Sequence, residues 1–193
     1  MISTGLFVVH RFHIPVQQNR PVPLWVFGDV HYDAPLFARS VWERFIKEAA
    51  RERAWLLGLG DYVDFASTGE RKRISAAELH DSRMTTFEDV AMRRVHQIAD
   101  DLQPFKKRIV GLLEGNHFFQ FPDGTTSTQR LCRLLECHYL GAAAFVRITL
   151  PRQAKKDGYG PAVDFYLHHG RGASRLLGGS LSQTHRRCGR SNC

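Results

Sequence analysis

Four short apolar runs end in side chains that can bind a metal ion, and this pattern constrains the fold more than any other feature. The runs lie at 24–27, 55–59, 109–113 and 162–167. Short continuous apolar runs predict buried strands, and we expect two further strands at 6–14 and 144–150. Longer stretches with helical spacing of apolar residues separate them, at 36–53, 87–102 and 128–137. Buried strands alternating with helices predict an α/β fold.

Polar residues follow each of the four runs directly. They read D-V-H at 29–31, G-D-Y-V-D at 60–64, E-G-N-H at 114–117 and H-H-G at 168–170. In open α/β sheets ligands bind at the carboxyl ends of the strands, so we expect the four ends to meet in one crevice. Their mixture of carboxylate, amide and imidazole favours Mn²⁺, Fe or Zn²⁺ over Mg²⁺ alone.

The spacing within these motifs suits metal binding. On an extended backbone, Asp29 and His31 would point to the same side and could hold one ion together. Asp61 could bridge two ions, because each oxygen of a carboxylate accepts independently. A glycine beside each ligand would keep the turn tight.

The four motifs in this order resemble those of the calcineurin-like metallophosphoesterase superfamily, over residues 25–170. Phage and prophage members look most similar, because of the run G-D-Y-V-D-F-A-S and the insertion after it. The resemblance implies an αββα sandwich with its active site at the carboxyl ends of the strands. It also implies hydrolysis of a phosphomonoester or phosphodiester, with attack by a hydroxide that bridges two divalent ions, Mn²⁺ being favoured.

The resemblance further implies the roles of individual residues. Asp29 and His31 would bind the first ion, Asp61 would bridge both ions, and Asn116 and His169 would bind the second.

Three neighbouring residues complete the predicted site. His117 would contact the phosphoryl group and protonate or stabilise the leaving oxygen, and Asp64 would lie behind the ligands and orient one of them. His168 and His169 would face opposite ways on a strand. The family pattern places its ligand directly before the glycine, which favours His169.

The end of the chain departs from the family pattern. A final G-H-x-H motif is expected on another strand, but only 23 residues follow Gly170. The nearest match is Ser182-Gln183-Thr184-His185, which comes too early and has Gln at the first His position. We interpret the gene as truncated or shifted in frame, which would leave the sandwich incomplete at its C-terminus. A catalytically impaired remnant is therefore an alternative to an active enzyme.

Charge and neighbouring residues bear on the substrate. Phe65 and Phe118 stand where protein serine/threonine phosphatases have Arg and Glu, which disfavours a phosphoprotein phosphatase. The net charge is +8, and residues 171–193 contribute five arginines and no acid. A basic surface attracts nucleic acid, so a nucleotide or nucleic-acid substrate is our first expectation. A nucleic-acid-binding module that uses this tail is a further alternative.

The domain organisation is expected to be simple. Residues 1–170 would form the core, with a helical insertion at 65–106, and the basic Gly/Ser/Arg-rich tail at 171–193 would be disordered. No apolar run approaches the ~20 residues of a membrane span. His10, Arg11 and His13 interrupt the N-terminal apolar run, so we expect no signal peptide, no membrane partner and a cytoplasmic protein. The oligomeric state is left open.

The four cysteines form two C-x4-C pairs, Cys132 with Cys137 and Cys188 with Cys193. This spacing permits a zinc site, but reduced, unpaired thiols are the expectation for a cytoplasmic protein. Cys132 and Cys137 would lie on different faces of the helix predicted at 128–137.

Overall fold

The chain is mixed α/β, as the sequence predicts. The computed structural model describes residues 9–15, 20–32, 34–65, 81–151 and 160–170, without the side chains of 81–84. Residues 66–80 of the expected helical insertion, the predicted tail at 171–193 and His185 lie outside the described residues. Among the described residues, no helix has both the length and the apolar character needed to cross a membrane.

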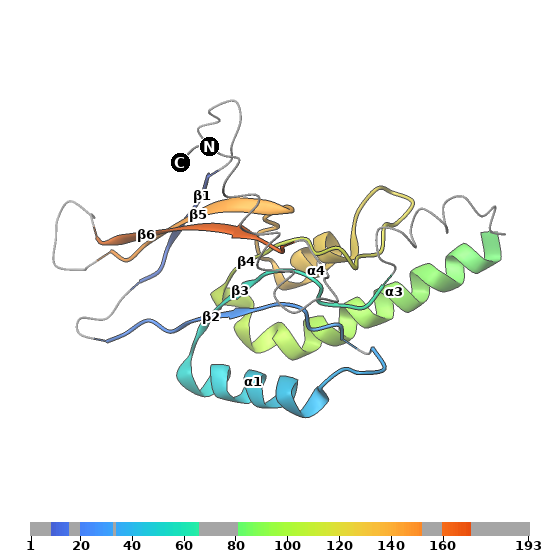
Figure 1. The fold of residues 1–193 in the computed structure, drawn as a ribbon, viewed down its shortest axis with the longest axis horizontal. Helices are drawn as coiled ribbons and strands as arrows, with labels where there is room; N and C mark the ends of the chain where they lie inside the picture. The colour runs from blue at the N-terminus through green and yellow to red at the C-terminus, as the bar shows by residue number, and fades with distance from the viewer. Residues whose placement is uncertain (1–8, 16–19, 33, 66–80, 152–159, 171–193) are drawn as a thin grey trace, which may run out of the picture.

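Three parallel strands form the first sheet, in the order β2 (Leu24–Phe27), β3 (Trp55–Gly58) and β4 (Ile109–Leu112) (Figure 1). Each strand matches a predicted apolar run to within a residue or two at its end. The strands are parallel, so their carboxyl ends lie at the same edge of the sheet. The segments that follow them therefore start close together.

Helices cover one face of this sheet. They are α1 (Arg39–Glu52), α3 (Asp81–Leu102), the 3-10 helix η1 (Gln103–Arg108) and α4 (Ser127–Leu135). Pro104 lies in the first turn of η1, where the change to 3-10 geometry ends α3 as predicted. A large apolar cluster joins helices and sheet, and it includes Phe27, Trp42, Leu56, Ile98, Leu112 and Leu131.

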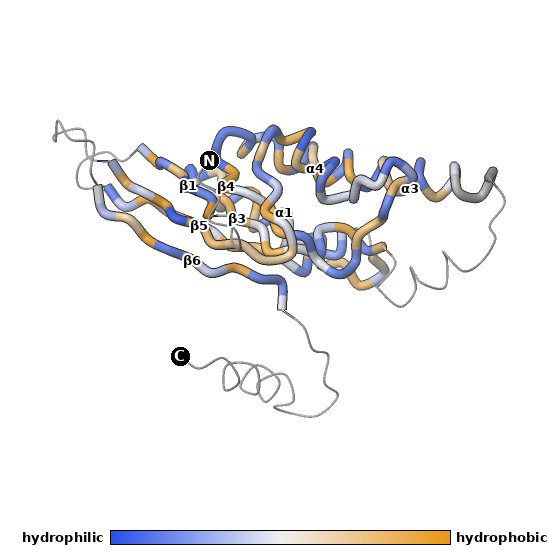
Figure 2. Tube along the Cα trace, turned by 90° about the horizontal axis from the view of Figure 1, so that it is seen from above, coloured by the Kyte–Doolittle hydropathy of each residue, from blue (hydrophilic) through white to orange (hydrophobic). Residues whose placement is uncertain are grey.

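A second sheet packs on the other face of the first. It contains β1 (Val9–His13), β5 (Ala143–Thr149) and β6 (Ala162–His168), with β1 parallel and β6 antiparallel to β5. Hydrophobic and hydrophilic residues alternate along β6, as expected for a strand with one covered face (Figure 2). The core between the sheets is built from Ile14, Leu57, Val110, Leu113, Val146, Ile148 and Leu167.

Two features of the sheets are visible only in the structure. β6 does not belong to the sheet of the other three site-bearing strands, so the four polar ends approach one another from two sheets. The described helices cover the first sheet alone, and the outer side of the second exposes Phe145 and Tyr166. The continuous apolar run of β2 is also less covered than predicted, because Val26 is half exposed.

Replacing Leu57 by alanine tests the packing between the sheets. Leu57 is fully buried in that core, and Leu36 is almost fully exposed. Because the cavity left behind collapses only partly, we expect Leu57→Ala to lower the free energy of unfolding by about 2–5 kcal/mol. Leu36→Ala should change it by less than about 0.5 kcal/mol. Urea denaturation measures both values, and equal stability of the two variants would contradict the packing.

Candidate metal centre

The turns after β2 and β3 adopt left-handed backbone conformations at three site residues. The φ angles are 50° at Asp29, 45° at His31 and 53° at Asp61. Such φ values cost roughly 1–2 kcal/mol in residues other than glycine, and they concentrate at functional sites. The expectation that Asp29 and His31 lie on an extended backbone is therefore wrong. Two successive left-handed turns bring their side chains to the same place.

Backbone hydrogen bonds join these two turns. The N–H of Asp29 donates to the carbonyl of Gly60 (3.0 Å), and that of His31 donates to the carbonyl of Asp61 (2.9 Å). The N–H of Tyr32 continues the pattern to the carbonyl of Tyr62 (2.9 Å). The pairing of β2 with β3 is thus extended beyond both strands, which fixes the position of Asp29 and His31 relative to Asp61.

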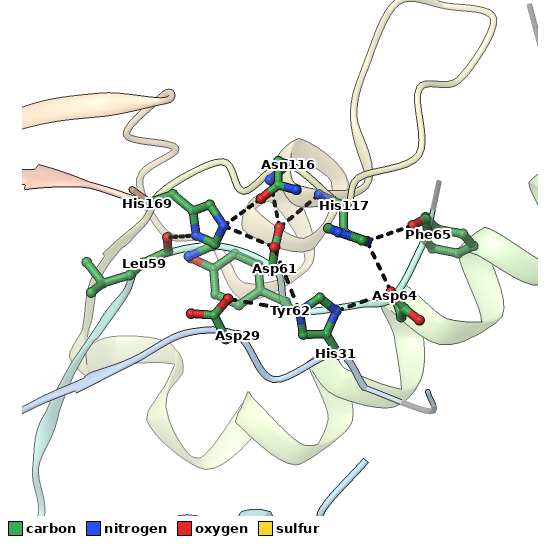
Figure 3. Close-up of polar contacts among 11 residues, drawn as sticks. Asp29, His31, Leu59, Asp61, Tyr62, Asp64, Phe65, Asn116, His117 and His169 are labelled. Atoms are coloured by element: carbon green, nitrogen blue, oxygen red, sulfur yellow. Dashed lines mark hydrogen bonds and ion pairs between the residues drawn. The ribbon is translucent and has the colours of Figure 1, made fainter. Parts of the chain in front are cut away.

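Asp61 lies at the centre of the site, with its side chain 3% exposed. Its Oδ1 accepts hydrogen bonds from the backbone N–H groups of Asn116 (2.7 Å) and His117 (2.8 Å). Its Oδ2 lies 3.0 Å from Nε2 of His169 and 3.8 Å from Nε2 of His31 (Figure 3). Oδ2 alone faces both imidazoles.

Glycine at position 115 makes this arrangement possible. A Cβ there would collide with the carboxylate of Asp61, so the backbone of the third motif approaches the carboxylate more closely than any other residue permits. At Gly60, with φ 109°, a Cβ would likewise collide with Gly115 and the ring of His169. The glycines beside the predicted ligands therefore allow close contact between the motifs.

His169 reaches the site from the end of β6. Its Nδ1 lies 2.9 Å from the carbonyl oxygen of Leu59, which requires a proton on Nδ1. In the neutral ring Nε2 then carries a lone pair, and it faces Oδ1 of Asn116 (2.8 Å) as well as Oδ2 of Asp61. Three electron-pair donors that converge in this way form an arrangement suited to a cation.

His168 and His169 diverge at the end of the strand. The side chain of His169 is 11% exposed and lies within the polar cluster. His168 is exposed, and its ring lies 5.6 Å from that of Tyr166 on the outer side of the sheet. The structure thus places in the site the histidine that the family pattern favours.

Asp64 contacts two histidines through Nδ1 of each ring. Its Oδ1 lies 3.1 Å from Nδ1 of His31 and 3.1 Å from Nδ1 of His117. The carbonyl oxygen of Phe65 lies a further 3.1 Å from Nδ1 of His117. Nε2 of His31 is therefore the atom that faces Asp29 (3.9 Å) and Asp61. Hydrogen bonding of the far ring nitrogen is the usual way in which proteins orient a ligand histidine.

Arg94 supports this part of the site, a role that was not predicted from the sequence. It lies on α3, where Nη1 donates to the carbonyl of Asp64 (2.8 Å) and the guanidinium lies 5.3 Å from the ring centroid of Phe65. The sequence offered one clue to this role. Arg94 lies beside the apolar stripe of Ala91, Val95 and Ile98, where a charged residue needs a partner.

The predicted site residues meet in one cluster with two groups of donor atoms. Asp29, Asp61 and His169 form one group, and His31, Asp64 and His117 form the other, with the donor atoms of each group within 4.8 Å of one another. In the first group, carboxylate oxygens and an imidazole nitrogen at this spacing could hold a divalent transition-metal ion, whereas in the second group Asp64 orients the two rings. Asn116 adds an amide oxygen to the first group through its contact with His169.

Comparison with known proteins gives no further support for an assignment. No model of a known protein family matches the chain, and no curated protein matches it significantly.

Replacing Arg94 tests its supporting role. Arg94→Gln removes the charge from the contacts with Asp64 and Phe65, so the segment that orients His31 and His117 should loosen. We expect the affinity for Mn²⁺, measured by calorimetric titration, to fall by about 10-fold. Arg93→Gln is the matched control, because Arg93 is the exposed neighbour on the same helix. Equal affinities of the two variants would show that Arg94 does not position the site.

Proposed function

We propose that the chain is a metal-dependent phosphoesterase of the calcineurin-like metallophosphoesterase type, acting on a phosphomonoester or phosphodiester. The supporting observation is the position of Asp61, whose Oδ2 lies between Nε2 of His31 and Nε2 of His169. A carboxylate oxygen that faces two imidazole nitrogens is placed where it could bridge two neighbouring ions.

The proposed ligands divide into two sets around Asp61. Asp29 and His31 would hold one ion, and Asn116 and His169 would hold the other, with Asp61 common to both. Two divalent cations held by these residues would polarise a phosphoryl oxygen and lower the pKa of coordinated water. Mn²⁺ suits the mixed oxygen and nitrogen donors, and Fe or Zn²⁺ would also fit them.

His117 is the proposed proton donor to the leaving oxygen. Asp64 and the carbonyl of Phe65 are both acceptors at its Nδ1, so Nδ1 carries a proton. The proton that a charged ring can release is then the one on Nε2. Proton transfer from a positioned side chain to the leaving group is ordinary general acid catalysis.

Fold and substrate remain part of this proposal. The complete architecture would be the αββα sandwich of the superfamily, of which the described residues supply the helices on one side and both sheets. The proposed substrate is a nucleotide or nucleic acid, and the proposed compartment is the cytoplasm. Within the superfamily, the proposal is an enzyme of the phage or prophage type. The carbonyl oxygen of Phe65 lies 3.1 Å from Nδ1 of His117, and the Phe65 ring lies 5.6 Å from that of Phe119, so these rings would be the nearest apolar surface for such a substrate.

Hydrolysis of a chromogenic bis-phosphodiester with added Mn²⁺ tests the proposal. Asp61→Asn keeps the shape of the side chain and an acceptor for the N–H groups of Asn116 and His117, but removes the charge. We expect its rate to fall by more than the ~100-fold that loss of an outer hydrogen-bond partner costs. Asp100→Asn, an exposed aspartate on α3, should retain the full rate.

Two results would contradict the enzyme proposal. Equal rates for wild type and Asp61→Asn would show that the activity does not come from this site. Mn²⁺ binding that requires Asp61, without any hydrolysis, would identify the chain as an impaired remnant that has kept its metal site.

A further inference from the structure

The end of α4 brings together two cysteines that are five residues apart. α4 ends at Leu135, and Glu136 turns into a left-handed conformation with φ 51°. The N–H of Cys137 then donates to the carbonyl of Cys132 (3.0 Å), and that of Glu136 donates to the carbonyl of Arg133 (3.3 Å). This pair of bonds is a Schellman motif, in which the side chains of the first and last residues lie side by side.

The expectation that Cys132 and Cys137 lie on different faces of one helix is therefore wrong. A five-residue step separates two side chains on a continuous helix. Here the helix stops before Cys137, and the turn that ends it folds Cys137 back against Cys132.

The two thiols are in contact but differ in their surroundings. A hydrogen bond to the thiol of Cys137, together with burial, raises the pKa of Cys132 well above its ordinary value. Cys132 is 4% exposed, whereas Cys137 is only partly buried. Both line an open surface cavity of about 540 Å³, with Gln129 and Tyr139. A small reagent in the cavity would meet Cys137 first.

A zinc site is not supported at this pair. Zinc in proteins takes at least three protein ligands. Among the residues that the structure describes, neither cysteine belongs to a group of three metal-binding side chains.

We propose that Cys132 and Cys137 form a redox-active dithiol that a small-molecule disulfide oxidises to an intramolecular disulfide. The thiolate of Cys137 attacks one sulfur of the reagent, which breaks the reagent's S–S bond, forms a mixed disulfide and releases one thiol. The hydrogen bond between the two thiols is lost once Cys137 is in the mixed disulfide. Cys132 then attacks the sulfur of Cys137 and passes its proton to the departing thiolate, which leaves as the second thiol. Two protein thiols and one reagent disulfide become one protein disulfide and two reagent thiols. This inference does not depend on the phosphoesterase proposal.

The test uses the full chain with Cys188→Ser and Cys193→Ser, which removes the other two thiols. The protein is equilibrated with reduced and oxidised glutathione, in buffer and in urea, and the remaining thiols are then alkylated. Oxidation to the disulfide removes two hydrogen atoms and so lowers the intact mass by about 2 Da. The oxidised protein also lacks the mass of the alkyl groups that the two free thiols would carry. Trypsin cleaves after Arg130 and Arg133, so the disulfide would join two separate peptides.

The equilibrium constant for oxidation of the two thiols by oxidised glutathione should be more than ~10-fold larger in buffer than in urea. The reason is that the turn in the folded protein raises the effective concentration of one thiol at the other. Further replacement of Cys137 by serine should abolish the linked pair of peptides. An equilibrium constant in buffer no larger than that in urea would overturn the proposal. A stable mixed disulfide between glutathione and Cys137, with no disulfide formed between Cys132 and Cys137, would also overturn it.

Discussion

The site depends on the two hydrogen bonds that backbone N–H groups of Asn116 and His117 donate to the carboxylate of Asp61. They hold the buried carboxylate in place and both involve its Oδ1, so that Oδ2 faces the imidazoles of His31 and His169. A buried carboxylate is costly unless such donors satisfy it. The contact also requires glycine at position 115, so the third motif is shaped by the second.

The two sheets contribute to the site in different ways. The parallel first sheet brings three motifs to one edge, and bonds between the turns lock the first two together. The second sheet delivers His169, whose Nδ1 is anchored on the carbonyl of Leu59. The core between the sheets, around Leu57 and Leu167, therefore determines whether that imidazole meets the carboxylate.

Much of the fold and most of the candidate site could be predicted from the sequence. Apolar runs identified the strands closely, because buried strands differ sharply from their polar ends, and the same ends named Asp29, Asp61 and His169. Sheet membership of β6 could not be predicted, because a local pattern does not say which strands pair. The left-handed turn at Asp29 and the Arg94 contact were also missed, because both are fixed by partners distant in sequence.

The most direct test of the central claim is an anomalous difference map from crystals of the protein grown with Mn²⁺. If Asp61 bridges two ions, the map will show two peaks about 3.5–4 Å apart, both within bonding distance of Oδ2 of Asp61. One peak would adjoin Asp29 and His31, and the other Asn116 and His169. A map without a peak at Asp61, or with manganese bound only elsewhere, would contradict it.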